Sequence, residues 1–397
     1  MFPVGYGLVS IDAAQPVQGG ADHTPEPSPL SSMQAHPPRS LLLVARGLDP
    51  IGTGRQTELV AEAFQAAGWR VHLAVTTAGG AVAPRLERAG VIVHRLSTRP
   101  VIDAAVAVRL ALLARGLVSG PPDVVLACGR SQTRLATAVK LLMPTVWFVS
   151  HLSMRPQGTS LRLALCKADR VIASSPAVAA GCDGLGVPTV KIVTIPPASD
   201  PPAAEGRSRA ELASRLGLDP GKIWTLCVAP LVAEARLERL LWAIDQLGVV
   251  HRGLEHVLVG AGPLRARMLR RARVQQLAER LRLFPHLDCL PDLLREVRLV
   301  WQPGEVACGG GLLDGMALGI PGVAVESDPA RQLIVDGETG RIVPAEPESE
   351  FPRRALGIIE DDGLVARYGT AAQARAADAF PKDRMVAAVM AACEPSA

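Results

Sequence analysis

The stretch GEVACGGGLLDGMALGIP, residues 304–321, combines a glycine triplet with a carboxylate on an apolar helical repeat. Gly309, Gly310 and Gly311 are expected at a helix start, where free backbone N–H groups can hold a diphosphate without any side chain. Asp314 falls off the apolar stripe of that helix, so it could accept hydrogen bonds from ribose hydroxyls. Glu305 lies in the preceding loop, either as a second polar contact or as a surface residue.

A second glycine-rich segment, LDPIGTGRQTE at 48–58, links a short apolar run to a helical repeat. Gly52 and Gly54 allow the backbone to approach a ligand closely, and Arg55 follows them. The spacing is not the full GxGxxG of a dinucleotide site, and a tight strand-to-helix turn is the alternative.

VGAGPLR at 259–265 repeats this arrangement further along the chain. Gly260 and Gly262 follow an apolar run, Pro263 is placed at a first helical position, and Arg265 lies in the first turn. Arg265 could reach a phosphate or a nucleobase, or it could be a solvated helix arginine. The arginines that follow, up to Arg273, are typical of a solvated face, with a weak attraction to anionic lipid as the alternative.

His151 follows the apolar run TVWFVS, so we expect it at the carboxyl end of a strand. There it could serve as a hydrogen-bond donor or a base, or it could be a structural histidine whose hydrogen bonds are satisfied. The sequence has no D-x-D pair, no metal-ligand spacing, no G-x-S-x-G elbow and no P-loop. Metal catalysis, serine hydrolysis and P-loop NTP hydrolysis are therefore poorly supported.

Composition indicates a large globular protein with buried cores. The chain has 397 residues, 48% of them hydrophobic, a net charge of +4 and 3% aromatic residues, so we expect no nucleic acid partner. The seven cysteines are scattered without a CxxC pair, which favours reduced thiols in a cytoplasmic protein. No apolar run approaches ~18 residues, and the amino terminus lacks the features of a secretory signal.

Apolar runs of strand length alternate with helical repeats, which predicts an α/β protein with parallel sheets covered on both faces. Residues 1–38 are rich in Pro, Gly and Ser and are predicted to be disordered. The alternation occupies 39–198, is interrupted by the proline-rich IPPASDPPAAEG, and resumes over 199–382, with a final helix in 383–397. Two domains of this kind would hold a substrate in the cleft between the carboxyl ends of their strands.

These segments together resemble the retaining glycosyltransferases of family 4, which have the GT-B fold of two facing Rossmann-like domains. The matching segments, spread over residues 40–393, are GTGRQTELVAEAFQAAGWRVHLAVT, ADRVIASSPAV, GVPTVKIVTIPPASD, VGAGPLR, QPGEVACGGGLLDGMALGIPGVAVESD and VDGETGRIVP. The resemblance implies a nucleotide-sugar donor, no metal or other cofactor, and an acceptor held by the first domain. It also implies that the last helix crosses back to the first domain.

The chain departs from the family pattern at the donor site. The family has two glutamates in the donor block; Asp314 takes the place of the second, and Val306 stands where the first would be, one position after Glu305. The family's arginine and lysine in G-R-L-x-x-x-K-G, which bind the donor diphosphate, are replaced by Pro230 and Ala235. Arg236 or Arg265 could substitute for this pair. His151 aligns with a histidine of the family's first domain.

The sequence therefore predicts a glycosyltransferase that moves a sugar from a nucleotide sugar to a glycan, lipid or small-molecule acceptor. The donor is expected against Gly260, Gly262, Arg265, Gly309 to Gly311 and Asp314, and the acceptor against Gly52, Gly54 and Arg55, with His151 and Glu305 as catalytic candidates. A catalytically inactive protein that binds a nucleotide sugar or glycan, or serves as a scaffold, is the alternative. A two-Rossmann dehydrogenase is a third reading, disfavoured because no GxGxxG with a downstream acid is present.

Overall fold

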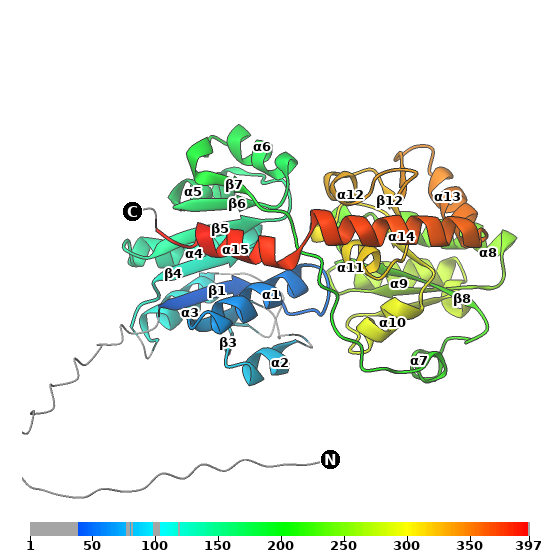
Figure 1. Cartoon of the computed structure of the whole chain (residues 1–397), viewed down its shortest axis with the longest axis horizontal. Helices are drawn as coiled ribbons and strands as arrows, with labels where there is room; N and C mark the ends of the chain where they lie inside the picture. The colour runs from blue at the N-terminus through cyan, green and yellow to red at the C-terminus, as the bar shows by residue number, and fades with distance from the viewer. Residues whose placement is uncertain (1–38, 77–79, 81, 98–103, 118–119, 396–397) are drawn as a thin grey trace, which may run out of the picture. The chain divides into compact units, whose positions relative to one another are not determined.

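The apolar runs form two parallel sheets (Figure 1). A helix follows nearly every strand and brings the chain back to the amino end of the next strand, so that successive strands run in the same direction. The computed structural model describes residues 39–76, 80, 82–97, 104–117 and 120–395. The predicted disordered tail, residues 1–38, lies outside the described residues. The prediction of an α/β protein with two parallel sheets is confirmed.

The first sheet has seven parallel strands in the order β3-β2-β1-β4-β5-β6-β7. Its strands are β1 (Ser40–Ala45), β2 (Arg70–Val75), β3 (Ile92–Arg95), β4 (Val124–Cys128), β5 (Trp147–Leu152), β6 (Arg170–Ala173) and β7 (Ile192–Thr194). The helices between them are α1 (Thr53–Ala66), α2 (Ala83–Arg88), α3 (Ala104–Arg115), α4 (Arg130–Leu142), α5 (Thr159–Lys167) and α6 (Pro176–Gly184).

The second sheet has six parallel strands in the order β10-β9-β8-β11-β12-β13. Its strands are β8 (Ile223–Val228), β9 (Leu254–Val259), β10 (Leu281–Phe284), β11 (Leu299–Gln302), β12 (Gly322–Val325) and β13 (Gly340–Val343). The helices that precede, join and follow these strands are α7 (Arg209–Leu216), α8 (Leu237–Val250), α9 (Arg265–Val274), α10 (Leu290–Glu296), α11 (Leu312–Ala317), α12 (Asp328–Leu333), α13 (Glu350–Ile359) and α14 (Asp362–Ala379).

Each sheet is buried on both faces, as its near-continuous apolar strands require. In β1, Leu41 and Leu43 face one hydrophobic cluster of the first sheet, while Leu42 and Val44 face another. In β8, Leu226 and Cys227 likewise belong to different clusters of the second sheet. All four cores are therefore filled by the alternation of side chains along the strands.

The strand order reverses direction once in each sheet, between β1 and β4 and between β8 and β11. Loops that leave neighbouring strands at such a point diverge to opposite faces, and ligands of open α/β sheets bind there, outside the carboxyl ends of the strands. The loops at these two points include the glycine segment around Gly52 and the glycine triplet that ends at Gly311.

The last helix, α15 (Lys382–Ala392), packs on the first sheet rather than on the second, beside α1 (Figure 1). Val389 is fully buried in the core of the first sheet, and the Trp147 Nε1–H donates to the carbonyl of Ala392 at 3.1 Å. The chain thus passes twice between the sheets, and Ser199 N donates to the Phe380 carbonyl at 2.7 Å where the two passages meet.

The helix that carries Asp314, α11, packs against α14. A Cβ atom on Gly369 of α14 would lie 2.1 Å from the carbonyl oxygen of Gly319, which follows α11. That distance is far inside van der Waals contact, so only glycine at position 369 allows α14 to pack this closely.

We predict that Gly369→Ala lowers the free energy of unfolding by roughly 1–3 kcal/mol, because the added methyl group forces the two backbones apart. Gly357→Ala in α13 is the matched control, since no heavy atom lies within 4 Å of its Cβ position. There the gain in helix propensity should raise stability by about 0.5–1 kcal/mol. Urea unfolding of both variants checks this; a stabilised Gly369→Ala protein would contradict the packing argument.

Candidate functional site

The loops that follow β8 and β11 lie directly against each other at the carboxyl edge of the second sheet. Glu305 N donates to the carbonyl of Glu234 at 2.9 Å. A Cβ atom on Gly304 would lie 2.6 Å from the same carbonyl oxygen, and one on Gly310 would lie 2.2 Å from the carbonyl oxygen of Val228. Glycine at 304 and 310 is therefore required by close packing of the two loops, whether or not a ligand is bound.

The glycine triplet does not present its N–H groups as the sequence suggested. Residues Ala307–Gly309 form a short 3₁₀ turn, in which Gly309 N donates to the Val306 carbonyl at 3.0 Å and Gly310 N donates to that of Ala307 at 3.2 Å. The expectation that these two N–H groups are free for a diphosphate is therefore wrong. Helix α11 itself begins only at Leu312.

The turn VGAGPLR packs against the β8 loop by the same means. Cβ atoms on Gly260 and Gly262 would lie 1.9 and 2.5 Å from the carbonyl oxygens of Ala229 and Leu231. This approach places Arg265 at the first position of α9, half-buried. Its Nη1 is buried and has no hydrogen-bond partner in the structure.

Gln302, the last residue of β11, was not identified from the sequence. It is 2% exposed, its Nε2 donates to the Gly304 carbonyl at 3.1 Å, and its Oε1 is buried without a partner. That oxygen lies 3.6 Å from the Cβ position of Gly309. A buried, unpaired polar atom costs roughly 1–3 kcal/mol, so Arg265 and Gln302 each retain capacity for a polar ligand group or a water molecule.

Asp314 is buried, not on the open face of its helix. It is 2% exposed, and its Oδ2 accepts the backbone N–H of Gly52, from the loop after β1, at 3.3 Å. Burial raises the pKa of the Asp314 carboxyl from 3.8 to about 7, against the opposing effects of the Gly52 N–H and of Arg55. The carboxyl group of Asp314 thus links the segment of the glycine triplet to the glycine segment around Gly52.

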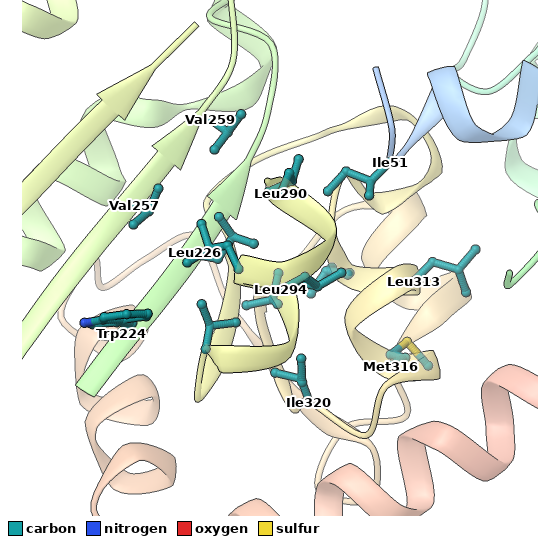
Figure 2. Close-up of a cluster of buried hydrophobic side chains, with 14 of the residues drawn as sticks. Ile51, Trp224, Leu226, Val257, Val259, Leu290, Leu294, Leu313, Met316 and Ile320 are labelled. Carbon is teal, nitrogen blue, oxygen red and sulfur yellow. The ribbon is translucent and has the colours of Figure 1, made fainter. Parts of the chain in front are cut away.

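The same loop places Ile51 in the hydrophobic core of the second sheet. Ile51 is 2% exposed and lies 3.5 Å from the Cβ position of Gly311. Figure 2 shows it among the side chains of this core, which otherwise come from the second sheet and the helices around it. Sequence periodicity could not reveal this contact, because Ile51 lies outside any repeat.

Arg55, predicted to bind an acceptor, is already occupied by acidic partners. Its Nη1 donates to Glu58 at 2.7 Å and its Nη2 donates to Asp200 at 2.8 Å, while Nε donates to the Asp200 carbonyl at 2.7 Å. The side chain is 7% exposed. Arg55 therefore ties α1 to the linker after β7 and is not available to a ligand. Gly54 likewise meets protein: its Cβ would lie 2.2 Å from the Asp49 carbonyl oxygen.

His151 lies at the carboxyl end of β5, as predicted, and is 8% exposed. Burial lowers the pKa of its imidazole to about 4. The ring is therefore neutral at pH 7, so it can exchange hydrogen bonds but does not supply a proton as an imidazolium ion.

Glu305 lies in a group of charges contributed by both sheets. Arg130, at the start of α4, is 3.9 Å from Glu234, and Arg155, after β5, forms an ion pair with Asp328 at the start of α12. Burial and the charge of Asp328 raise the pKa of the half-buried Glu305, while Arg130 and Arg155 oppose the shift. Both arginines follow strand ends, so the carboxyl-edge rule could have identified them.

The two residues at the positions of the family's diphosphate-binding cations both lie in the segment between β8 and α8. Ala235 is fully buried, and Pro230 is half-buried in the loop after β8. Arg236, the proposed substitute, is exposed with a positive φ of 50° and caps the start of α8. Asp314, Gly52 and the glycine triplet thus lie together, while Arg55 is withdrawn from the site.

Two cavities open elsewhere, at the amino edges of the sheets. One, of about 470 Å³, is lined by Arg209, Trp224 and Arg298; the other, of about 440 Å³, is lined by Arg39, Trp69 and Trp147. Within the described parts of the chain, we find no group of three side chains suited to a metal ion. None of the described helices is both long and apolar enough to cross a bilayer.

Comparison with known families identifies both halves of the chain. Residues 52–198 match the glycosyl transferase 4-like domain, and residues 223–361 match the glycosyl transferases group 1. The two matches follow each other without overlap and together cover more than two thirds of the chain.

Curated relatives match over shorter stretches. The chain is 29% identical to alpha-D-kanosaminyltransferase of Streptomyces kanamyceticus over 162 residues, 40% of this chain and 42% of the relative. It is 38% identical to phosphatidyl-myo-inositol mannosyltransferase of Mycolicibacterium smegmatis over 64 residues, 16% of this chain and 17% of the relative. The matched stretches thus span less than half of each relative.

Solved structures share the fold over nearly the whole chain. Anabaena HepE in complex with UDP-glucose superposes with a TM-score of 0.72 at 18% identity, covering 89% of this chain and 98% of HepE. WaaG, a glycosyltransferase involved in lipopolysaccharide biosynthesis, gives 0.69 at 14% identity, over 89% of this chain and 100% of WaaG. Two family domains in order, on a fold shared with these structures, show that the chain belongs to the group 1, family 4-like glycosyltransferases and has the GT-B fold.

Proposed function

We propose that the protein transfers a sugar from a nucleoside diphosphate sugar to an acceptor hydroxyl group. The observation that carries this proposal is Arg265, whose buried Nη1 has no partner beside the glycine turn of the second sheet. A guanidinium group in that position suits a phosphate or a nucleobase oxygen, and each charged hydrogen bond is worth roughly 1.5–3 kcal/mol. The proposed donor therefore lies against α9, Gln302 and the start of α11.

The names of the similar proteins support a nucleotide-sugar donor. HepE was solved with UDP-glucose, and the curated relatives are named as glycosyl-transferring proteins. These names share no acceptor, so for this chain we propose only a hydroxyl group on a glycan, a lipid or a small molecule. The proposed reaction retains the anomeric configuration and uses no metal or other cofactor, as the family resemblance implies.

In the proposed reaction, the bond between the sugar C1 and the diphosphate oxygen breaks, and its electron pair leaves with the diphosphate. The acceptor oxygen forms the new bond to C1, and its proton passes to the departing diphosphate oxygen. The leaving group gains negative charge, so cations that contact it lower the barrier, and removing such a contact can cost ~10²–10³ in rate. Arg265 and the exposed Arg236 are the proposed contacts in place of the missing pair.

The proposed acceptor lies near the carboxyl end of the first sheet, where His151 is neutral. A neutral imidazole can accept a hydrogen bond from the attacking hydroxyl group. Glu305, half-buried between Arg130 and Arg155, is the proposed second polar contact to the sugar. Gly52 contributes its N–H only when that group is not bonded to Asp314.

We predict that Arg265→Gln weakens binding of the cognate nucleotide about 10- to 100-fold, because one charged hydrogen bond to the ligand is lost. Thermal shift and calorimetric titration with UDP, GDP, ADP and their sugars measure the effect. Arg270→Gln on the same helix is the matched control, since Arg270 is exposed and lies outside the proposed contact. Equal affinity of the Arg265 and Arg270 variants would contradict the proposed donor site.

A non-catalytic protein that binds a nucleotide sugar or a glycan is the second candidate function. It is favoured by Pro230 and Ala235 at the cation positions and by the bond between Asp314 and Gly52. Release of free sugar from the donor, measured in the presence and absence of acceptors, separates the two. Donor turnover that is lost in Asp314→Ala supports the enzyme, whereas tight binding without turnover supports the second candidate.

The raised pKa of Asp314 predicts a pH-dependent stability. Between about pH 4 and pH 7 the unfolded carboxyl group ionises while the folded one keeps its proton, so the free energy of unfolding falls as pH rises. Asp314→Asn keeps an oxygen for the Gly52 N–H and does not titrate. The free energy of unfolding of this variant, relative to that of the original protein, should therefore rise by roughly 2–4 kcal/mol between pH 4 and pH 7, measured by urea unfolding. If the difference in free energy of unfolding between the two proteins does not change with pH, Asp314 is ionised in the folded state.

A further inference from the structure

The outer face of three neighbouring helices of the first sheet carries exposed aliphatic side chains. Helix α3 contacts α4, and α4 contacts α5. Their inner faces fill one core, yet five outward-facing residues are each 56–65% exposed: Val108, Leu112, Leu141, Leu142 and Leu163. Single exposed aliphatic residues are ordinary, but five on adjacent helices are typical of a contact surface.

The same three helices contain no Asp or Glu. Their exposed basic residues are Arg109, Arg115, Arg134, Arg162 and Lys167. Of the acidic residues in the described chain that follow these helices, Asp169 pairs with Lys140 at 2.8 Å, and Asp123 accepts the Ser40 N–H at 2.7 Å. We call this combination of exposed aliphatic and basic side chains on α3, α4 and α5 the basic-aliphatic face.

We infer that the basic-aliphatic face binds the surface of an anionic lipid bilayer. Aliphatic side chains enter the boundary between headgroups and acyl chains, while arginine and lysine remain among the lipid phosphates. Each basic residue near such a surface is worth about a fivefold gain in affinity, and the aliphatic side chains add to it. This inference is independent of whether the protein transfers a sugar.

Charge distinguishes a bilayer from a second copy of the chain. A twofold dimer formed through this face would set arginines against arginines, because the same patch would meet itself. An anionic bilayer instead supplies phosphate to every basic residue at once.

The arginine-rich helix α9, which the sequence suggested for lipid contact, is less suited to this role. Arg267 pairs with Glu238 at 3.2 Å, and the adjacent helix α8 also carries Asp245. Exposed Val249 and Val274 lie at the ends of α8 and α9, so this region provides a matched control of similar composition.

The basic-aliphatic face also leaves the candidate site open. Arg115, Leu142 and Lys167 lie at or next to the carboxyl ends of α3, α4 and α5. Because helices in such a fold run opposite to the parallel strands, these ends lie toward the amino edge of the sheet, away from the loops that carry Gly52 and His151.

The test is cosedimentation of the full chain with vesicles of phosphatidylcholine, either alone or with about one part in three phosphatidylglycerol. We expect binding to the anionic vesicles only. Arg115→Gln/Arg162→Gln/Lys167→Gln should weaken it roughly 100-fold, and Leu112→Ser/Leu163→Ser about 10-fold. Cys166, the exposed one of the seven cysteines, lies on α5 in this face. An environment-sensitive dye on Cys166 should report a less polar surrounding in bound protein.

The control replaces the same kinds of side chain on the other surface, as Arg270→Gln/Arg273→Gln/Val274→Ser. It should bind as tightly as the original protein. Failure of the original chain to bind anionic vesicles, or equal binding to neutral ones, would overturn the inference. So would loss of binding in the control with retention in the α3–α5 variants, which would assign the contact to α9.

Discussion

The close approach of three loops, those after β1, β8 and β11, is the constraint on which the candidate site depends. Ile51 enters the core of the second sheet, and Gly52 donates its N–H to the buried Asp314. Glycine at 304 and 310 removes the side chains that would keep the other two loops apart. Apolar burial favours this approach, whereas burial of a carboxyl group opposes it, so the pKa of Asp314 is raised.

Glycine-rich segments are ambiguous in a sequence for a physical reason. A ligand and a neighbouring backbone impose the same requirement, the absence of a Cβ atom, and the residue type cannot separate them. Here a Cβ atom added to Gly260, Gly262, Gly304 or Gly310 would in each case lie within 2.6 Å of a backbone carbonyl oxygen of the protein. The better indication of a ligand is the unpaired polar atom, as in Arg265 and Gln302, and it is visible only when all other contacts are known.

The sequence was sufficient for the two parallel sheets, because strand length and helical period are local properties. It also placed His151 and the glycine turns around Gly52 and Gly260 correctly at the ends of strands. It could not predict that Arg55 is neutralised by Asp200, because the two residues are 145 positions apart and their meeting depends on the linker path. The burial of Asp314 was missed for the same reason, since the Gly52 N–H that its carboxyl group accepts lies in the other half of the chain.

The place of α15 on the first sheet has a consequence for synthesis on the ribosome. Val389 and its neighbours, which complete the core around β1, are translated only after the whole second sheet. A nascent chain therefore holds a first sheet with an uncovered apolar strip while the second sheet is already able to close. The half that is translated first is therefore the last to be completed, and until then its apolar strip is exposed to solvent.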